Sequence, residues 1–126
     1  MDARDTVEAY YESLRAGEPL GPYFGAPSDG DAPVKVGISE RLVGLDAIRA
    51  GLREQTETTA DWVVDSQDLR VTERSSVAWF SDAVRLAWTD TDRGGRVEFD
   101  TRWSGTLERG NRWRFVGMHV SAPREL

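Results

Sequence analysis

The chain has 126 residues with a formal net charge of −6, and 39% of its residues are hydrophobic. This composition is typical of a folded domain with a hydrophobic core, and the acidic balance argues against a nucleic-acid partner, which requires a basic surface. The absence of cysteine excludes disulfides, thiolate metal sites and a cysteine nucleophile. No apolar run reaches the length of a membrane span, and residues 1–5 do not resemble a signal peptide. We therefore expect a single cytoplasmic domain over residues 1–126 without a membrane partner.

The N-terminal half predicts two helices around a short strand. Residues 5–16 carry an apolar stripe at helical spacing, formed by Val7, Tyr10, Tyr11 and Leu14. A segment rich in glycine and proline follows and predicts a loop with a short helical turn. A strand is then expected over residues 34–38, and a second helix over residues 44–56.

The C-terminal half predicts an antiparallel sheet. Apolar and polar residues alternate in four runs that turn signals separate, namely residues 62–72, 77–89, 96–109 and 112–121. Such alternation is typical of strands with one buried face. A helical half followed by a meander predicts an α+β fold, in which the helices cover the apolar face of the sheet.

The turn candidate Gly110-Asn111 sets the register of the last hairpin, because a two-residue turn places Arg109 opposite Arg112. Counting back then places Arg102 opposite His119. One face of the hairpin is polar and carries Asp100, Arg102, Ser104, His119 and Ser121. The other face is apolar and carries Phe99, Trp103, Leu107, Val116, Met118 and Val120.

Turns with an even number of residues would extend these two faces over the rest of the sheet. The apolar face then gains Asp65, Gln67, Asp82 and Trp88, whereas the outer, polar face shows Trp62, Trp79 and Trp113. A cavity is expected between the apolar face and the helices.

Three stretches carry a resemblance to a known family: residues 44–48, residues 76–80, and residues 102–107 together with 113–121. They resemble the SnoaL-like group of the nuclear transport factor 2-like superfamily, and the last stretch also resembles the association domain of calmodulin-dependent kinases. The resemblance implies a cone-shaped α+β fold of N-terminal helices packed on a curved, mostly antiparallel sheet. It implies no single activity, because this fold hosts isomerases, cyclases, dehydratases, hydrolases and binding or assembly domains.

The ketosteroid isomerase branch requires a carboxylate base and two oxyanion donors, a tyrosine and a protonated aspartic acid. The resemblance places the tyrosine at Tyr10. It places the second donor at Trp103, which is no acid, and the base near Lys35 or Val36, where no carboxylate stands. A steroid isomerase of this type is therefore not expected.

The polar sheet face offers one set of candidate residues. His119, Arg102 and Asp100 could form a catalytic triad, since histidine is the usual general acid or base. The favoured hypothesis is an interface of a homodimer, because the resembling families pack a second subunit on this face. The expected interface residues are Asp100, Arg102, Trp113, His119 and Ser121. The histidine stands alone, with no cysteine or second histidine, which argues against a metal site, and no metal or cofactor is expected.

The apolar face offers a second set, for a flat organic ligand. The expected binding residues are Tyr10, Tyr11, Tyr23, Gln67, Trp88, Trp103 and Met118, although aromatic residues at helical spacing can also be plain core. Asp82 would face the cavity as a base or acid, with Tyr10 as hydrogen-bond donor. The only lysine, Lys35, could bind an anion or act as an amine nucleophile, but a solvated side chain on an edge strand is the favoured interpretation.

The sequence thus leaves three functional hypotheses. The first is a protein that binds a small organic molecule in an apolar, aromatic pocket. The second is a cofactor-independent isomerase, cyclase or hydrolase that uses Asp82 and Tyr10. The third is a pocketless dimerisation or assembly module.

Overall fold

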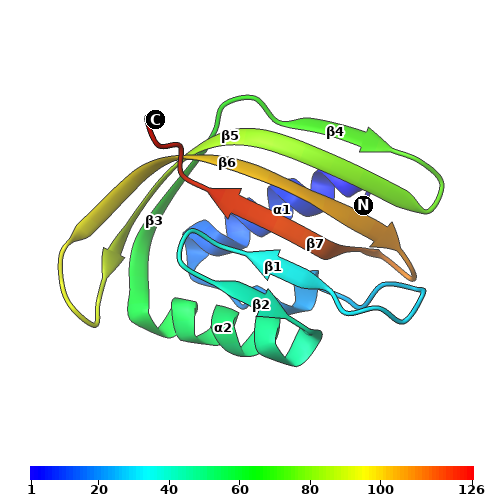
Figure 1. The fold of residues 1–126 in the computed structure, drawn as a ribbon, viewed down its shortest axis with the longest axis horizontal. Helices are drawn as coiled ribbons and strands as arrows, with labels where there is room; N and C mark the ends of the chain where they lie inside the picture. Colours follow the sequence, from blue (N-terminus) through cyan, green and yellow to red (C-terminus); the bar gives the residue numbers. More distant parts are fainter.

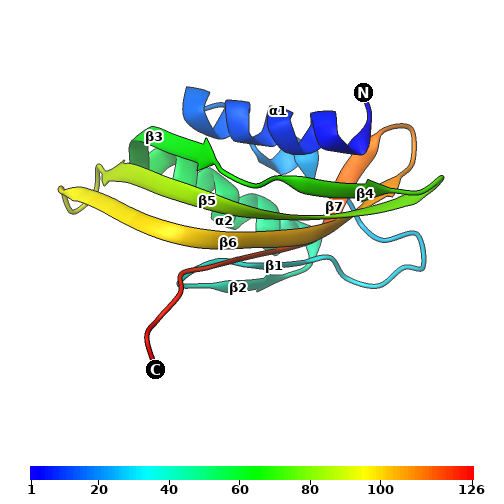
Figure 2. The same cartoon turned by 90° about the horizontal axis from the view of Figure 1, so that it is seen from above.

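Two helices lie against one face of a seven-stranded, strongly curved sheet (Figures 1 and 2). The computed structural model describes residues 1–126. The elements in chain order are α1 (Ala3–Ala16), the 3-10 turn η1 (Gly21–Tyr23), β1 (Val34–Val36), β2 (Arg41–Val43), α2 (Leu45–Thr58), β3 (Thr59–Ser66), β4 (Arg70–Glu73), β5 (Val77–Asp90), β6 (Arg96–Arg109) and β7 (Trp113–Ser121). The predicted α+β fold is confirmed.

The strand order is β2-β1-β7-β6-β5-β3. Strand β4 also pairs with β5, along a different part of β5 from the part that pairs with β3. All pairings are antiparallel except that of β1 with β7, which is parallel. The sequence did not predict β2, which forms a hairpin with β1 and becomes the edge of the sheet. Lys35 of β1 therefore has a strand on each side, so the expectation of an edge strand is wrong.

Helix α1 begins at Ala3, earlier than the sequence predicted, because Asp2 caps it. The Asp2 carboxylate accepts a hydrogen bond from the Asp5 amide at 2.8 Å, and the Asp5 carboxylate accepts one from the Asp2 amide at 3.0 Å. This reciprocal pair satisfies two amides that the first turn leaves free. The helix ends at Gly17, whose left-handed backbone (φ 70°) suits glycine. The predicted apolar stripe is buried against the sheet.

The last hairpin departs from the predicted register. Its turn is one residue longer than expected, so Arg109 pairs with Trp113, and a bulge after Thr106 shifts the strands again. Beyond the bulge, Ser104 pairs with His119 and Arg102 with Ser121, so the predicted pairing of Arg102 with His119 is wrong. Beyond the bulge the pairing differs from the predicted one by two residues, so each side chain there keeps its predicted face.

Between the turn and the bulge, the single shift reverses the faces of β7, because one residue of slip turns every side chain over. Trp113, which was expected on the outer face, is 5% exposed and belongs to the core. Its predicted place on the polar face is wrong. Val116 lies at the bulge and is only half-buried.

Strand β3 contains a second irregularity, between Ala60 and Val63. Asp61 there has a left-handed backbone (φ 55°), which is uncommon for a residue with a side chain. Next to this bulge, Trp62 lies on the inner face, where it stacks on Trp88. Its predicted outward position is wrong because the faces of β3 are reversed: Val63 is exposed, whereas Val64 is buried on the same side as Trp62.

The pairing with β5 shifts by one residue between the end of β3 and the start of β4. This offset reverses the expected faces of β3. Asp65 pairs with Arg85 and is exposed, as is Gln67. The predicted position of Asp65 and Gln67 on the apolar face is therefore wrong. Leu69 and Val71, after the offset, pack against the core.

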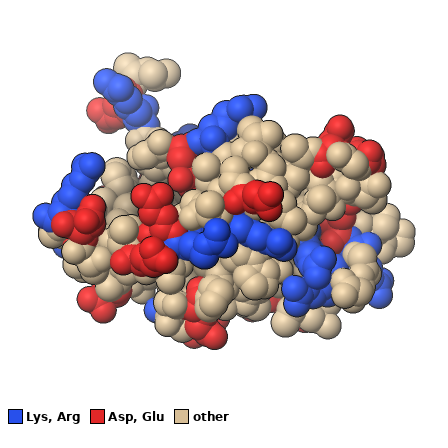
Figure 3. Space-filling model, turned by 90° about the horizontal axis from the view of Figure 1, so that it is seen from below, with Lys and Arg blue, Asp and Glu red and all other residues tan.

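The outer face of the sheet carries no helix (Figure 2). The side of the molecule that carries α2 shows acidic and basic side chains intermixed rather than a field of one sign (Figure 3). Neither helix has the length and apolar character that a membrane crossing would require.

Candidate functional site

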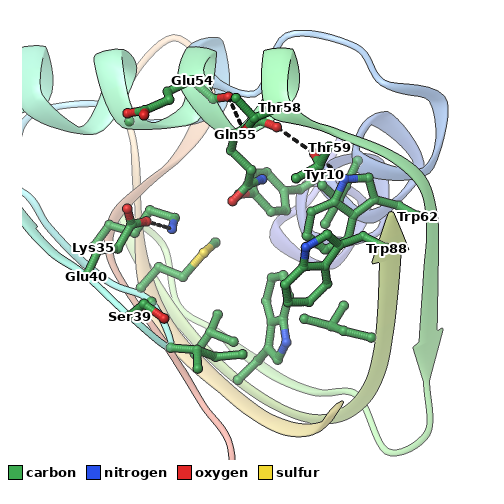
Figure 4. A pocket seen from close by; sticks show the side chains of 18 residues that line it. Tyr10, Lys35, Ser39, Glu40, Glu54, Gln55, Thr58, Thr59, Trp62 and Trp88 are labelled. Atoms are coloured by element: carbon green, nitrogen blue, oxygen red, sulfur yellow. Dashed lines mark hydrogen bonds and ion pairs between the residues drawn. The ribbon is translucent and has the colours of Figure 1, made fainter. Parts of the chain in front are cut away.

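A cavity of about 350 Å³ opens between α2, the β1–β2 hairpin and the inner face of the sheet (Figure 4). Its size falls in the range of small-molecule sites. Half of its lining is hydrophobic. The lining residues are Tyr10, Leu14, Lys35, Gly37, Ile38, Ser39, Glu40, Gly51, Glu54, Gln55, Thr58, Thr59, Trp62, Leu86, Trp88, Trp103, Met118 and Val120.

One wall of the cavity consists of stacked aromatic rings. The indoles of Trp62 and Trp88 lie 4.7 Å apart between centroids, with planes inclined by 22°. Phe99 packs on Trp88 at 5.8 Å between centroids, with its ring tilted by 34°. Parallel rings of this kind offer flat apolar surface to a ligand and lose little conformational entropy on binding, because aromatic side chains have few torsions.

The position of Trp62 is held by three contacts around the bulge. Arg96 donates a hydrogen bond to the Asp61 carbonyl at 2.6 Å and another to the Thr89 hydroxyl at 3.1 Å. The indole N–H of Trp62 donates to the Thr59 hydroxyl at 2.9 Å. The bulge is therefore fastened to the neighbouring strands, and the ring is fixed in the cavity.

The opposite wall carries an ion pair. Lys35 lies on β1 next to Met118 of β7, and both side chains point inward. The Lys35 ammonium lies 3.0 Å from the Glu40 carboxylate, with the lysine side chain 6% exposed and the glutamate side chain 40% exposed. Figure 4 shows this pair facing the indoles of Trp62 and Trp88 across the cavity.

Tyr10 supplies a neutral hydrogen-bond donor to the cavity. Its ring is 2% exposed and packs edge-on against Trp103, Phe24 and Phe115. Burial, and then the negative charge of Glu40, raise the pKa of Tyr10 far above its ordinary value. The hydroxyl makes no hydrogen bond within the protein, whereas those of the other two tyrosines are paired. It can therefore donate to a ligand oxygen.

Other polar groups of the lining divide into paired and free ones. The hydroxyls of Thr58 and Thr59 donate to backbone carbonyls of α2 at 2.8 and 2.5 Å. The side chains of Gln55 and Ser39 and the indole N–H of Trp88 make no hydrogen bond within the protein and line the cavity. The Trp88 indole N–H can only donate, the Ser39 hydroxyl and the Gln55 amide can donate or accept, and the Glu54 carboxylate of the lining can only accept. The cavity can therefore pair a ligand that has hydrogen-bond acceptors.

The residues predicted to bind a ligand come together only in part. Tyr10, Trp88, Trp103 and Met118 line the cavity. Because these side chains form its walls, they do not fill it. Tyr23 lies beside α1, where its hydroxyl pairs with Ser13 at 2.8 Å. Tyr11, Tyr23 and Gln67 do not line the cavity.

Asp82 is buried, as the sequence predicted, but it faces a different set of groups. Its carboxylate accepts hydrogen bonds from the Tyr11 hydroxyl at 2.9 Å, the Ser66 hydroxyl at 2.5 Å and the Asp68 amide at 3.0 Å. Burial, followed by the charge of Asp82 and this hydrogen bond, raises the pKa of Tyr11 well above its ordinary value. The network joins α1 to the β3–β4 junction, and Asp82 does not line the cavity that Tyr10 lines.

The outer face of the sheet has a polar hollow of about 480 Å³. It brings together Arg102, His119 and Ser121 of the expected interface set, with Ser104, Ser81 and Arg70 around them. Asp100 lies outside it, with its carboxylate 3.9 Å from Arg85. Trp113 is in the core. The His119 side chain makes no hydrogen bond within the protein, so the structure forms no triad of Asp100, Arg102 and His119.

Sequence reasoning missed Lys35, Glu40, Gln55 and Trp62 as parts of one site. The only available signal was the single lysine of an arginine-rich chain, placed between two valines. Trp62 had no signal, because the offset between β3 and β4 reverses the faces that continuous alternation predicts. No group of three or more histidine and carboxylate side chains comes together in a metal-binding arrangement.

Comparison with known proteins identifies one family and many structures of the same fold. Residues 3–125 match the family described as the SnoaL-like domain. No curated protein matches the chain significantly. A proposed dehydratase of the nuclear transport factor 2-like family from Streptomyces avermitilis superposes with a TM-score of 0.82, at 17% identity over 97% of this chain and 94% of that one.

Two further structures show how widely the fold is used. A ketosteroid isomerase-like protein from Erwinia carotovora atroseptica has a TM-score of 0.75, at 15% identity over 97% of this chain and 94% of that chain. A proposed calcium/calmodulin-dependent protein kinase type II association domain from Thiobacillus denitrificans has a TM-score of 0.72, at 14% identity over 97% and 95%. The superpositions establish a common fold, but at identities this low the activity of one protein cannot be assigned to another.

Proposed function

Since the chain belongs to the SnoaL-like domain family, as its motifs predicted, we propose that it binds a small planar organic molecule in the cavity between α2 and the sheet. The stack of Trp62 on Trp88 is the observation that carries this proposal. A planar ring laid against the indoles would replace water on a large apolar surface, which is the main source of affinity in such sites.

The polar groups of the cavity would orient the ligand. The Tyr10 hydroxyl, the Gln55 amide and the Lys35–Glu40 pair stand around the space in front of the indoles (Figure 4). Groups of this kind add specificity, because an acceptor that misses them leaves buried donors unpaired. The ligand expected from this arrangement is a flat ring system that bears oxygen acceptors.

The experiment is a calorimetric titration with two-ring aromatic compounds, namely 2-naphthol, 2-naphthamide and 2-naphthoate. Trp62→Leu should weaken every compound that binds, because it removes one ring of the stack. Trp79→Leu is the matched control, since Trp79 is 46% exposed on the outer face. Equal loss of affinity in both variants, or no binding of any compound, would contradict the proposal.

A second candidate, an acid–base enzyme, is favoured by one observation. Glu40 and Tyr10 line the same cavity, and the charge of Glu40 acts on the Tyr10 phenol. A carboxylate base and a neutral donor are what proton abstraction beside a carbonyl requires. The pair named from the sequence, Asp82 and Tyr10, would have to act from two sides of the core.

Deuterium exchange of 2-tetralone, followed by nuclear magnetic resonance, tests this second candidate. The protein should accelerate exchange over buffer, and Glu40→Gln and Tyr10→Phe should remove the acceleration. Loss of exchange in folded Asp82→Asn, with full exchange in Glu40→Gln, would return the role of base to Asp82. Exchange at the buffer rate would count against an enzyme of this kind.

The third hypothesis, assembly, retains the outer face of the sheet. A pocketless module does not fit a chain with this cavity, but a homodimer is compatible with a binding role. The hollow formed by Arg102, His119 and Ser121, together with exposed Trp79, is the surface we propose for a second copy of the chain.

A further inference from the structure

The Lys35 ammonium has donors to spare. It makes one hydrogen bond, to Glu40 Oε1 at 3.0 Å, although an ammonium carries three N–H groups. Its side chain is 6% exposed, so bulk water does not surround the remaining donors. Because Lys35 lines the cavity, its remaining N–H groups can reach an acceptor only inside the cavity. A buried ammonium that is only partly satisfied favours an additional acceptor, and most of all an anionic one.

Glu40 and Lys35 differ in their freedom to move. Lys35 lies on β1, which has β2 on one side and β7 on the other, so its backbone is fixed in the sheet. Glu40 follows the tight turn between β1 and β2, and its side chain is 40% exposed. The Glu40 carboxylate makes no hydrogen bond other than that to Lys35. The carboxylate can turn into solvent, whereas the ammonium must stay in the cavity.

We propose that Lys35 anchors a carboxylate group of the ligand, and that this group takes the place of Glu40 at the lysine ammonium. The inference rests on the proposed function, since it names the class of planar molecule that the cavity takes: a flat ring that bears a carboxylate. The ring lies against Trp62 and Trp88, and the carboxylate reaches Lys35 on the opposite wall (Figure 4).

In this arrangement Glu40 is an internal competitor. Without ligand it neutralises the buried ammonium, which avoids the high cost of an unpaired charge. A ligand carboxylate restores the same pairing and releases Glu40 to water, where a carboxylate is well solvated. A neutral ligand leaves the pair intact and gains nothing from Lys35. An ammonium ligand would meet the positive charge of Lys35 beside Glu40.

Two ligands of nearly the same shape, one anionic and one neutral, test the inference, namely 2-naphthoate and 2-naphthamide, titrated calorimetrically. The protein should bind the acid roughly tenfold or more tightly than the amide, the size of effect expected of a charge-assisted pair. Lys35→Met should abolish this preference. Glu40→Gln should increase it, because the competing carboxylate is gone. Trp79→Leu, on the outer face, should leave the preference unchanged.

The single lysine provides a second readout that needs no variant. Protein labelled with ¹⁵N-lysine has one side-chain signal, that of Lys35. Saturation with 2-naphthoate should shift this signal, and 2-naphthamide should leave it in place. The readout therefore remains decisive if Lys35→Met does not fold.

Failure of the carboxylate inference can be distinguished from failure of the proposed function. If neither compound binds, the proposed function itself is wrong. If both bind with equal affinity, the lysine signal stays in place and Glu40→Gln has no effect, then the cavity binds planar rings but Lys35 does not recognise a carboxylate. Weaker binding of 2-naphthoate in Glu40→Gln would also overturn the inference, because it would make Glu40 a contact of the ligand rather than its competitor.

Discussion

Trp62 of β3 stacks on Trp88 of β5 at 4.7 Å, on the same inner face of the sheet as buried Val64. The bulge beside Trp62 contains the left-handed backbone of Asp61, and Arg96 donates a hydrogen bond to the Asp61 carbonyl. A local irregularity thus borders the aromatic wall of the site. Strain of this kind persists where the surroundings hold it, and it often marks functional positions.

The backbone of Asp61 leads to a stability test. Asp61→Val should destabilise the fold by about 1–2 kcal/mol, because a β-branched residue tolerates a positive φ poorly. Asp61→Gly should be neutral or stabilising, since glycine adopts this conformation freely. Urea denaturation gives both values. Asp65→Val, on the regular and exposed part of the same strand, is the control and should change little. Equal effects of the two valine variants would show that the Asp61 backbone stores no strain.

The Asp82 network should contribute more to stability than to binding. Asp82→Asn disturbs the hydrogen bonds from Tyr11, Ser66 and the Asp68 amide. Such a change in a buried network costs about 1–3 kcal/mol, so the urea midpoint should fall while ligand affinity stays close to that of the unaltered protein. Asp65→Asn, on the exposed face, is the matched substitution. Strong loss of affinity in folded Asp82→Asn would instead favour the catalytic role first predicted for this residue.

Stability should fall at alkaline pH. In the folded protein burial raises the pKa of Tyr10 and of Tyr11 above their ordinary value. The unfolded chain therefore loses these protons first, near its tyrosine pKa of about 10. The stabilisation is fully present below pH 10 and declines above it, by up to about 1.4 kcal/mol per pH unit for each tyrosine.

The variants Tyr10→Phe and Tyr11→Phe separate these contributions. Each should reduce the slope of unfolding free energy against pH above pH 10 and leave the slope at pH 7 unaltered. Tyr23→Phe serves for comparison, since Tyr23 is less buried. A slope that stays the same in all three variants would mean that the buried tyrosines do not determine the alkaline limit.

The homodimer proposal makes a prediction for the outer face. Arg102→Ala or His119→Ala should weaken self-association, because each leaves a polar partner unmatched across the interface at a cost of about 1–3 kcal/mol. Sedimentation velocity at low micromolar concentration measures the effect. Arg93→Ala, in the exposed β5–β6 turn, should not alter it. A monomeric unaltered protein, or a dimer that both variants keep, would contradict the assignment.

The sequence predicted the elements that depend on long-range periodicity. The stripe on α1 and the alternation along β5 and β6 reflect burial of one face, and burial is what such patterns record. The short strand β2 was missed because its three residues, Arg41–Val43, do not alternate between apolar and polar as those of β1 do. The family was recognised from motifs that combine strand and turn residues, and these survive small errors of register.

The site was harder to predict, because it depends on offsets of one residue. The offset between Ser66 and Leu69 reverses the faces of β3, which brings Trp62 into the cavity and takes Gln67 out of it. This offset involves neither glycine nor proline, the residues that usually announce an irregularity. The pairing of Lys35 with Glu40 depends on a hairpin that the sequence did not reveal. Positions fixed by tertiary contacts therefore escaped a pattern-based prediction.

The most direct test of the central claim uses the five tryptophans as position markers. Their indole ¹⁵N–¹H signals, assigned by single substitutions, are followed while 2-naphthoate is added. We expect ring-current shifts at Trp62 and Trp88, which face the cavity, and none at Trp79 on the outer face. Saturable binding that shifts Trp79 and leaves Trp62 and Trp88 unmoved would place the ligand on the outer sheet face and contradict the account.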